Sequence, residues 1–281
     1  MKPFYYDFDA PFIDLVIFTD WHIGAGGYEG KIVDESFIEL LVKHVLKNDR
    51  CYCYVLDDLM ECTLRNSIGN IFGQYLSPRA QKYRILDLLE PLAESGKILG
   101  WVHSNHSQRL TREADIYLGE EIARQLNFPF HGYQGAGFFK IGRVTYMAGF
   151  HHGTGGGYTE GAKINAADRI AAGLPMSDIY CLGHSHVVRH FTRVRKCPTI
   201  IRRRRGQQTS CEIRDHLQHV CICGSMMTYD GSYAEAKGYP QAECSAVSIR
   251  LHGLNNGQAT RRIEFFRIIR SGGKLDISGV A

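Results

Sequence analysis

Five short segments rich in aspartate and histidine recur along the chain, and each follows a short apolar run. Apolar runs closed by polar residues are typical of strands buried within a sheet. Between the first three runs, apolar residues recur with helical spacing at residues 36–48 and 78–89. This order predicts parallel β-α-β units, whose loops gather at the carboxyl ends of the strands. The five segments are Asp20-Trp21-His22, Asp57-Asp58-Leu59-Met60-Glu61, Ser104-Asn105-His106, His151-His152-Gly153 and Gly183-His184-Ser185-His186.

The rest of the chain predicts further helices and a second sheet. A helical pattern covers residues 113–126, and another covers residues 162–172. Strands are expected at residues 138–141, 144–149 and 178–182, and near 199–205, 220–223, 246–251 and 265–269. No linker or internal repeat divides the chain, so we expect one α/β domain over residues 1–281. Its core would cover about residues 13–190, and a β-rich part at about 191–281 would complete the second sheet.

The charge of the chain is unevenly distributed. The 281 residues carry a net charge of +4, and residues 189–205 contain eight basic residues and no acidic one. Without these eight, 25 basic residues face 29 acidic ones. A basic stretch of this kind can attract a polyanion. The alternative is a solvated hairpin edge, because charged edges prevent unwanted strand pairing.

The cysteines and the apolar runs indicate a cytoplasmic protein. The nine cysteines are an odd number without framework spacing, which suits free thiols in a reducing compartment. Residues 1–10 carry acids and lack an apolar stretch, so no signal peptide is expected. No apolar run approaches the length that spans a bilayer, so no membrane partner is expected.

The side chains in the first two segments suit a divalent metal. Asp20 and His22 alternate along the chain, so both would point the same way from an extended segment. Carboxylate oxygen together with imidazole favours manganese, iron or zinc over calcium. Two adjacent carboxylates, Asp57 and Asp58, are costly unless a cation neutralises them. The alternatives are a surface turn for the first segment and a helix N-terminus for the second.

The other three segments add an amide and more histidines. The Asn105 oxygen can ligate a metal, and His106 would then face a substrate as a general acid. Adjacent strand residues point to opposite faces, so one of His151 and His152 is expected to be a ligand, and we favour His152, which is nearer the loop. His184 and His186, two residues apart after a strand, would project into one site.

The ordered set of segments resembles the calcineurin-like metallophosphoesterase superfamily. The usual pattern of that superfamily is D-x-H, G-D-x-x-D, G-N-H-D/E, a single His and G-H-x-H, and the match covers about residues 13–190. Residues 231–235 and 238–240 also resemble phosphoesterases encoded by bacteriophages. The resemblance implies a four-layer α/β/β/α sandwich of two mixed sheets flanked by helices.

The resemblance also implies the roles of particular residues. One metal would be held by Asp20, His22, Asp58 and His186, and the other by Asp58, Asn105, His152 and His184, with Asp58 bridging them. His106 would be the catalytic acid and Glu61 the carboxylate that pairs with it. The metals would be two divalent ions, from among Mn, Fe, Zn and Ni, with Mn favoured in vitro.

Three positions depart from the pattern of the superfamily. Asp57 and Ser104 replace glycines, and Ser107 replaces an acid. The lost glycines reduce backbone freedom near the site, and Asp57 would add negative charge close to an incoming phosphate. These departures bear on rate and substrate preference more than on metal binding.

The function expected from this set is metal-dependent hydrolysis of a phosphoester. A phosphodiesterase acting on DNA or RNA is the leading hypothesis, and a small phosphodiester or monoester is the second. A metal-stabilised binding protein and a serine hydrolase using Ser104 or Ser185 are further alternatives. The oligomeric state is left open. Candidate substrate-binding residues are Arg65, Asn66, Lys163, Asn165, Arg202 and Arg203.

Overall fold

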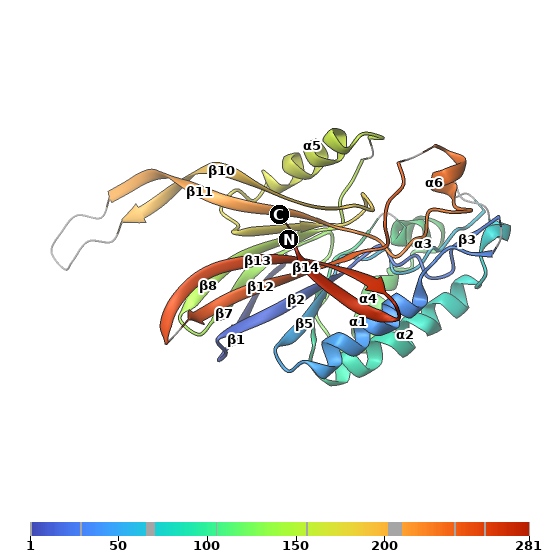
Figure 1. The fold of residues 1–281 in the computed structure, drawn as a ribbon, viewed down its shortest axis with the longest axis horizontal. Helices are drawn as coiled ribbons and strands as arrows, with labels where there is room; N and C mark the ends of the chain where they lie inside the picture. Colours follow the sequence, from blue (N-terminus) through green and yellow to red (C-terminus); the bar gives the residue numbers. More distant parts are fainter. Residues whose placement is uncertain are drawn as a thin grey trace.

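The computed structural model consists of two six-stranded sheets that face each other, with helices on both outer sides (Figure 1). It describes residues 2–28, 30–65, 71–104, 106–155, 157–201, 210–238, 240–255 and 257–280. This is the α/β/β/α arrangement expected from the sequence. None of the helices formed by these residues is long and apolar enough to cross a membrane.

The first sheet contains the three strands predicted from the earliest apolar runs. Its order is β14-β13-β12-β2-β5-β6, and β2, β5 and β6 are parallel. The strands are β2 (Phe12–Phe18), β5 (Cys51–Val55), β6 (Ile98–Trp101), β12 (Ala246–Asn255), β13 (Gln258–Ser271) and β14 (Lys274–Gly279). The C-terminal strands were expected in the second sheet, but β12 pairs antiparallel with β2 in the first. Apolar patterning shows that a strand is buried but not which sheet edge it joins.

The second sheet has the order β1-β7-β8-β9-β11-β10. Its strands are β1 (Lys2–Phe8), β7 (Gln134–Ile141), β8 (Val144–His151), β9 (Ile179–Leu182), β10 (Val188–Ile201) and β11 (Ser210–Cys223). Strands β8, β9 and β11 are parallel, whereas β10 and β11 form an antiparallel hairpin that extends beyond its neighbours (Figure 1). A short ribbon of β3 (Gly26–Gly27) and β4 (Gly30–Lys31) stands apart from both sheets.

The helices begin where the sequence provides capping side chains. Asp34, Ser77 and Thr159 each accept a backbone N–H at the start of a helix, which satisfies donors that lack an intrahelical partner. The helix expected at residues 113–126 begins only at Leu118, because Asp115 adopts a left-handed conformation (φ 54°) that ends a separate preceding helix, Ser107–Ala114. The helices are α1 (Glu35–Lys47), α2 (Pro78–Glu94), α3 (Ser107–Ala114), α4 (Leu118–Gln125), α5 (Glu160–Ala171) and α6 (Tyr233–Ala236), with a 3₁₀ turn at Ile71–Gly73.

The core divides into layers according to strand alternation. In β2, Val16 and Phe18 pack toward α1 and α2, while Leu15 and Ile17 pack between the two sheets. On the outer face of the second sheet, Ala167 and Ala171 of α5 pack against β9 and β11. The central strands β5, β6 and β9 are buried along almost their whole length, which fixes the ends of the two sheets relative to each other where the candidate site lies.

Candidate metal centre

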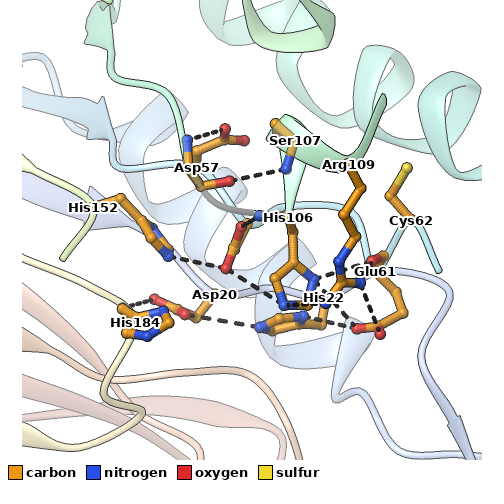
Figure 2. A network of polar contacts seen from close by, with 12 residues as sticks. Asp20, His22, Asp57, Glu61, Cys62, His106, Ser107, Arg109, His152 and His184 are labelled. Carbon is orange, nitrogen blue, oxygen red and sulfur yellow. Dashed lines mark hydrogen bonds and ion pairs between the residues drawn. The ribbon is translucent and has the colours of Figure 1, made fainter. Parts of the chain in front are cut away.

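The segments singled out in the sequence meet at one end of the sandwich (Figure 2). Asp20 and His22 follow β2, and Asp58 follows β5 in the same sheet. His152 follows β8 in the second sheet, and the pair His184 and His186 follows β9. Both sheets therefore contribute side chains to a common site. Asn105, the expected amide ligand, lies outside the described residues.

The first group consists of Asp20, His22 and His186, whose ligand atoms lie within 4.8 Å of one another. Nε2 of His186 lies 3.1 Å from Oδ1 of Asp20, and Nε2 of His22 lies 3.7 Å from the same oxygen. The two histidine Nε2 atoms are 3.3 Å apart. Three potential ligand atoms thus converge on one point.

The second group consists of Asp58, His152 and His184, again with ligand atoms within 4.8 Å of one another. Nε2 of His152 lies 2.9 Å from Oδ2 of Asp58. Nδ1 of His152 lies 2.6 Å from the carbonyl oxygen of Leu56, and because a carbonyl only accepts, Nδ1 is the donor. That contact directs Nε2 into the site. His151 instead accepts the N–H of Gly153 through its Nδ1, 2.8 Å away.

Glu61 lies between a proposed ligand and the proposed acid. Its Oε2 is 2.9 Å from Nδ1 of His22 but 4.0 Å from Nδ1 of His106. Thr63 donates a hydrogen bond to the other carboxylate oxygen at 2.8 Å. The closer contact therefore orients His22, in the way that carboxylates commonly hold metal-ligating histidines.

The ligand-bearing segments do not have the extended conformation that we expected. Asp20, His22, Asp58, His184 and His186 have φ angles of 50°, 49°, 52°, 66° and 54°. Residues with a Cβ rarely adopt this left-handed conformation, and such outliers gather at functional sites where the surroundings enforce them. The tight turns aim successive side chains differently, and so His184 and His186 enter separate groups.

Burial and neighbouring charges shift the protonation of the first group. Burial opposes the charged form of His22, but the nearby carboxylate of Asp20 and a hydrogen bond with Glu61 outweigh it and raise the pKa of His22 to about 10. Burial alone would raise the pKa of Asp20, yet its contacts with the imidazoles of His186 and His22 hold it well below its usual range. Protons on the imidazole therefore balance the buried carboxylate.

The second group contains a similar balance of charge. Burial would lower the pKa of His152, but the charge of Asp58, whose Oδ2 lies 2.9 Å from Nε2, raises the value to about 9. Burial, together with the neighbouring His152, lowers the pKa of His184 to about 4. A cation could replace the proton on His152, because metal ligands bind in their deprotonated form.

Two buried atoms indicate that a divalent metal fits this centre. Oδ1 of Asp20 and Nε2 of His152 are buried, and although they lie 3.1 Å from His186 and 2.9 Å from Asp58, neither contact has hydrogen-bond geometry within the described part of the chain. Buried polar atoms are normally satisfied, so each exception points to a missing partner. Carboxylate oxygen and imidazole nitrogen are ligands for manganese, iron, zinc or nickel, and the set does not select among these metals.

Asp57 faces away from the groups that could hold metal. Its Oδ2 accepts the N–H of Ser104 at 2.8 Å and lies 3.8 Å from Nδ1 of His103. Burial and the charge of Asp58 raise its pKa. Oγ of Ser104 in turn accepts the N–H of Ser107 at 3.2 Å. The three departures from the superfamily pattern thus form a buried support behind the site, and they do not place charge next to a substrate.

Sequence reasoning missed Arg109, which follows His106 by one helical turn. Nη2 of Arg109 lies 3.0 Å from Nε2 of His106, and Nη1 donates to the carbonyl oxygen of Glu61 at 3.1 Å. Burial lowers the pKa of His106, although the charge of Asp58 opposes this effect. The separation of three residues on a helix was the available signal, because such residues share a face.

A cavity of about 820 Å³ opens above both groups. Of the predicted substrate-binding residues, Lys163 lines this cavity, and its Nζ donates to the carbonyl oxygen of Ser185 at 2.9 Å. Arg65 and Asn165 are exposed and are not among the described residues of its lining. The other three predicted residues, Asn66, Arg202 and Arg203, lie outside the described residues.

The four basic residues in the described part of the basic stretch pair with three neighbouring acids, which neutralise it in part. Arg193 and Arg195 both pair with Asp168 of α5, at 3.0 and 2.6 Å. Lys196 pairs with Asp215 on the adjacent strand at 2.5 Å, and Arg189 pairs with Glu160. These pairs hold the hairpin against α5 and reduce the positive field expected from the sequence.

Comparison with known proteins adds little to this description. No protein-family model matches the chain, and no curated protein matches it. A crystal structure from Streptococcus pneumoniae TIGR4, described as a conserved uncharacterized protein and predicted phosphoesterase, aligns with 96% of this chain and 98% of its own. The sequence identity is 13% and the TM-score is 0.36. A likeness this low carries no argument, so the functional conclusion must come from the site itself.

Proposed function

We propose that this protein is a metal-dependent phosphoester hydrolase. The observation that carries the proposal is the convergence of two largely buried groups of carboxylate and imidazole ligands, from four loops, beneath one cavity. When bound, divalent cations supply positive charge to phosphoryl oxygens and acidify a water molecule. The residues that would hold them are Asp20, His22 and His186 in one group and Asp58, His152 and His184 in the other, with Asn105 as a further proposed ligand.

The residues around the ligands would position the acid and the phosphate. The carbonyl oxygen of Glu61 lies 3.1 Å from Nδ1 of His106, which makes Nδ1 a donor, so as a general acid His106 would give a proton from Nε2 of its doubly protonated form. Arg109 donates to that Nε2 in this structure, so protonation of Nε2 would displace the guanidinium group from it. The guanidinium group then lies close to the charge that a phosphoester brings.

A small phosphoester is better supported than nucleic acid as the substrate. Arg189, Arg193, Arg195 and Lys196 are already paired with acids, which weakens the electrostatic argument for a polyanion. The remaining support for a nuclease is the Arg202–Arg205 run, which lies outside the described residues. A nuclease assay on single- and double-stranded DNA separates the two hypotheses.

The proposal is tested with purified protein on 4-nitrophenyl phosphate and bis(4-nitrophenyl) phosphate in the presence of Mn²⁺, Fe²⁺, Zn²⁺ or Ni²⁺. We expect hydrolysis that a chelator abolishes. Replacing His106 with Ala should lower kcat by roughly 10²- to 10⁴-fold, the usual contribution of a general acid, without changing the metal content. His216→Ala, in the hairpin, is the matched control and should remain active.

Two outcomes would contradict the proposal. Protein that stays inactive on both esters with every metal would be a binding protein rather than a hydrolase. Activity that survives chelation would instead favour a hydrolase that uses Ser104 or Ser185 as its nucleophile.

A further inference from the structure

The cavity above the metal centre has walls from two segments that lie far apart in the sequence. We call residues 24–28 and 30–32 the glycine finger, and residues 225–238 and 240–243 the C-terminal wall. The N–H of Tyr28 in the finger donates to the carbonyl oxygen of Gly231 in the wall at 3.0 Å. A Cβ at Gly27 would lie 2.1 Å from that same carbonyl oxygen, so only glycine permits this close approach.

The C-terminal wall is also attached directly to the metal-ligand loop. The backbone N–H of Met226 and the hydroxyl of Ser225 both donate to the carbonyl oxygen of Asp20, each at 3.0 Å. The wall therefore has a fixed position relative to the proposed ligands. A cavity held by backbone hydrogen bonds is formed before any substrate arrives.

Away from the ligands, the lining of the cavity combines aliphatic and aromatic side chains with glycines and polar residues such as Gln74, Thr228 and Glu243. Tyr28 and Tyr158 lie at its solvent-exposed margin, with 95% and 65% of their surface exposed. Flat or apolar groups of a ligand would gain by contact with such a surface. Other apolar or aromatic residues of the lining are Ile32, Met227, Tyr229, Ala234, Ala236 and Ala242, of which Ile32 is buried.

Few positive charges accompany this apolar surface. Among the described residues of the lining, the cationic ones are Arg109 and Lys163, and both already donate hydrogen bonds to protein atoms. A nucleic-acid strand crossing the site would bring several phosphates, and such strands are bound by positively charged grooves. The lining instead suits a substrate with one phosphate at the metal centre and an uncharged organic group in the rest of the cavity.

We infer that the substrate is an ester of a single phosphate whose organic group is uncharged, carries a planar ring and is about the size of a nucleoside. The inference rests on the proposed function, because the phosphate must lie at the metal centre. The volume of about 820 Å³ is far more than a phosphate needs and falls within the range of small-molecule sites. The planar ring would contact the tyrosines of the finger and the wall.

A pair of esters with the same leaving group tests this inference. Thymidine 5′-(4-nitrophenyl phosphate) and methyl 4-nitrophenyl phosphate both lose 4-nitrophenol when water adds to phosphorus and the bond to the aryl oxygen breaks. We expect kcat/KM to be roughly 10- to 100-fold higher for the thymidine ester, the range that one stacked ring supplies. Equal values for the two esters would overturn the inference.

Two more substrates identify what the cavity recognises. Phenyl 4-nitrophenyl phosphate has a planar ring without a sugar. If its kcat/KM exceeds that of the methyl ester as much as the value for the thymidine ester does, the cavity recognises the ring alone, which would support the inference. An oligothymidylate strand cleaved faster per phosphodiester bond than the thymidine ester would contradict it, because a polyanion would then be preferred.

Variants of the C-terminal wall test whether the cavity is responsible for the higher kcat/KM of the thymidine ester. Tyr229→Ala removes an aromatic surface, and Ala242→Phe fills part of the volume, so each should reduce the preference for the thymidine ester by about tenfold. Tyr83→Ala is the control, because Tyr83 is an exposed tyrosine of α2 outside the cavity lining. An unchanged preference in both wall variants would contradict the inference.

A binding measurement separates failure of this inference from failure of the proposed function. If neither ester is hydrolysed with any metal, the proposed function is wrong, but the cavity can still be tested. Calorimetry on the manganese-loaded protein should then show thymidine 5′-monophosphate binding at least tenfold more tightly than inorganic phosphate. Equal affinities would overturn the inference without any need for turnover.

Discussion

Gly183 occupies a position where even one additional carbon atom does not fit. A Cβ there would lie 2.2 Å from Oγ1 of Thr19 and 2.6 Å from Oδ2 of Asp20. The same Oδ2 accepts the N–H of His184 at 2.9 Å. The close approach thus fixes a carboxylate of one sheet against the turn that carries the histidines of the other.

Replacing Gly183 with Ala should destabilise the protein by about 1–3 kcal/mol, the usual cost of overpacking, and should weaken metal binding. Gly161→Ala is the matched control, because a Cβ at Gly161 meets nothing within 4 Å and lies in the first turn of α5. The control should be neutral or slightly stabilising. Denaturant unfolding and metal titration of the two variants check this, and equal effects would contradict it.

The contacts of the Glu61 side chain favour a role in orienting His22, a proposed metal ligand, over a role in pairing with His106. Because it lies closer to His22 than to His106, Glu61→Gln should weaken metal affinity by roughly 10- to 100-fold, as loss of a carboxylate behind a ligand histidine does. Activity should recover when excess metal is supplied. Unchanged metal affinity with a lower kcat would show instead that Glu61 acts through His106.

At the scale of elements, polar contacts connect α1 and α2 on the outer face of the first sheet. Arg84 of α2 donates to Glu35 of α1 at 2.9 Å and to Glu39 at 2.5 Å. The hydroxyl of Tyr75 also donates to Glu35 at 2.6 Å. One carboxylate therefore organises the contact between the two helices above their apolar faces.

This carboxylate should make stability depend on pH in the acidic range. Burial would raise the pKa of Glu35, but hydrogen bonds from Lys31, Tyr75 and Arg84 lower it to about 2. A lowered folded-state pKa gives stability that is complete above the unfolded value of 4.5 and is lost as the pH falls through about 2. Because these partners are partly exposed to solvent, we expect a contribution of only about 1 kcal/mol.

Urea unfolding at pH 6 and pH 3 measures this contribution. Glu35→Gln should lower the free energy of unfolding at pH 6 and should lose less stability than the wild type on acidification. Glu90→Gln changes an exposed residue of α2 and is the control. Its free energy of unfolding should change between pH 6 and pH 3 by the same amount as that of the wild type. Parallel pH profiles for wild type and Glu35→Gln would contradict the assignment.

At the scale of the whole molecule, the metal centre joins the two sheets. Asp20, His22 and Asp58 belong to loops of the first sheet, and His152 belongs to the second. The apolar contact between the sheets includes Tyr54 stacked on Phe150 with ring centroids 3.7 Å apart. A bound cation would add a second link between the sheets at their open end.

Metal should therefore stabilise the entire fold. At a free metal concentration of about 100 times Kd, the free energy of unfolding should rise by about 2.7 kcal/mol, and Tm by roughly 5–10 °C. Chelation should reverse this shift in a thermal melt. A melting curve that responds to neither metal nor chelator would contradict the assignment of the site.

Metal affinity should also increase with pH. The pKa values of His22 and His152, about 10 and 9, mean that both hold protons at neutral pH before metal binds. Binding must displace these protons, so affinity should rise by up to about a hundredfold per pH unit below pH 9. Calorimetric titrations at pH 6.5 and 7.5, in buffers of different ionisation enthalpy, count the protons released. A pH-independent affinity would show that these histidines are not ligands.

Local patterns in the sequence determined the elements and the chemistry of the centre. Apolar runs predicted β2, β5, β6 and β9, and helical spacing predicted α1, α2 and α5, because both periodicities follow from backbone geometry over a few residues. Aspartate and histidine at the ends of those strands predicted the site, since carboxyl ends of parallel strands meet at one edge.

Tertiary structure alone decided how these side chains combine. His22 and His186, 164 residues apart, lie side by side, while neighbouring His184 joins the other group. The attachment of β12–β14 to the first sheet and the closure of the cavity by the glycine finger and the C-terminal wall are likewise long-range events. They depend on which sheet edges pair and how tightly the backbones approach, and no local periodicity encodes either.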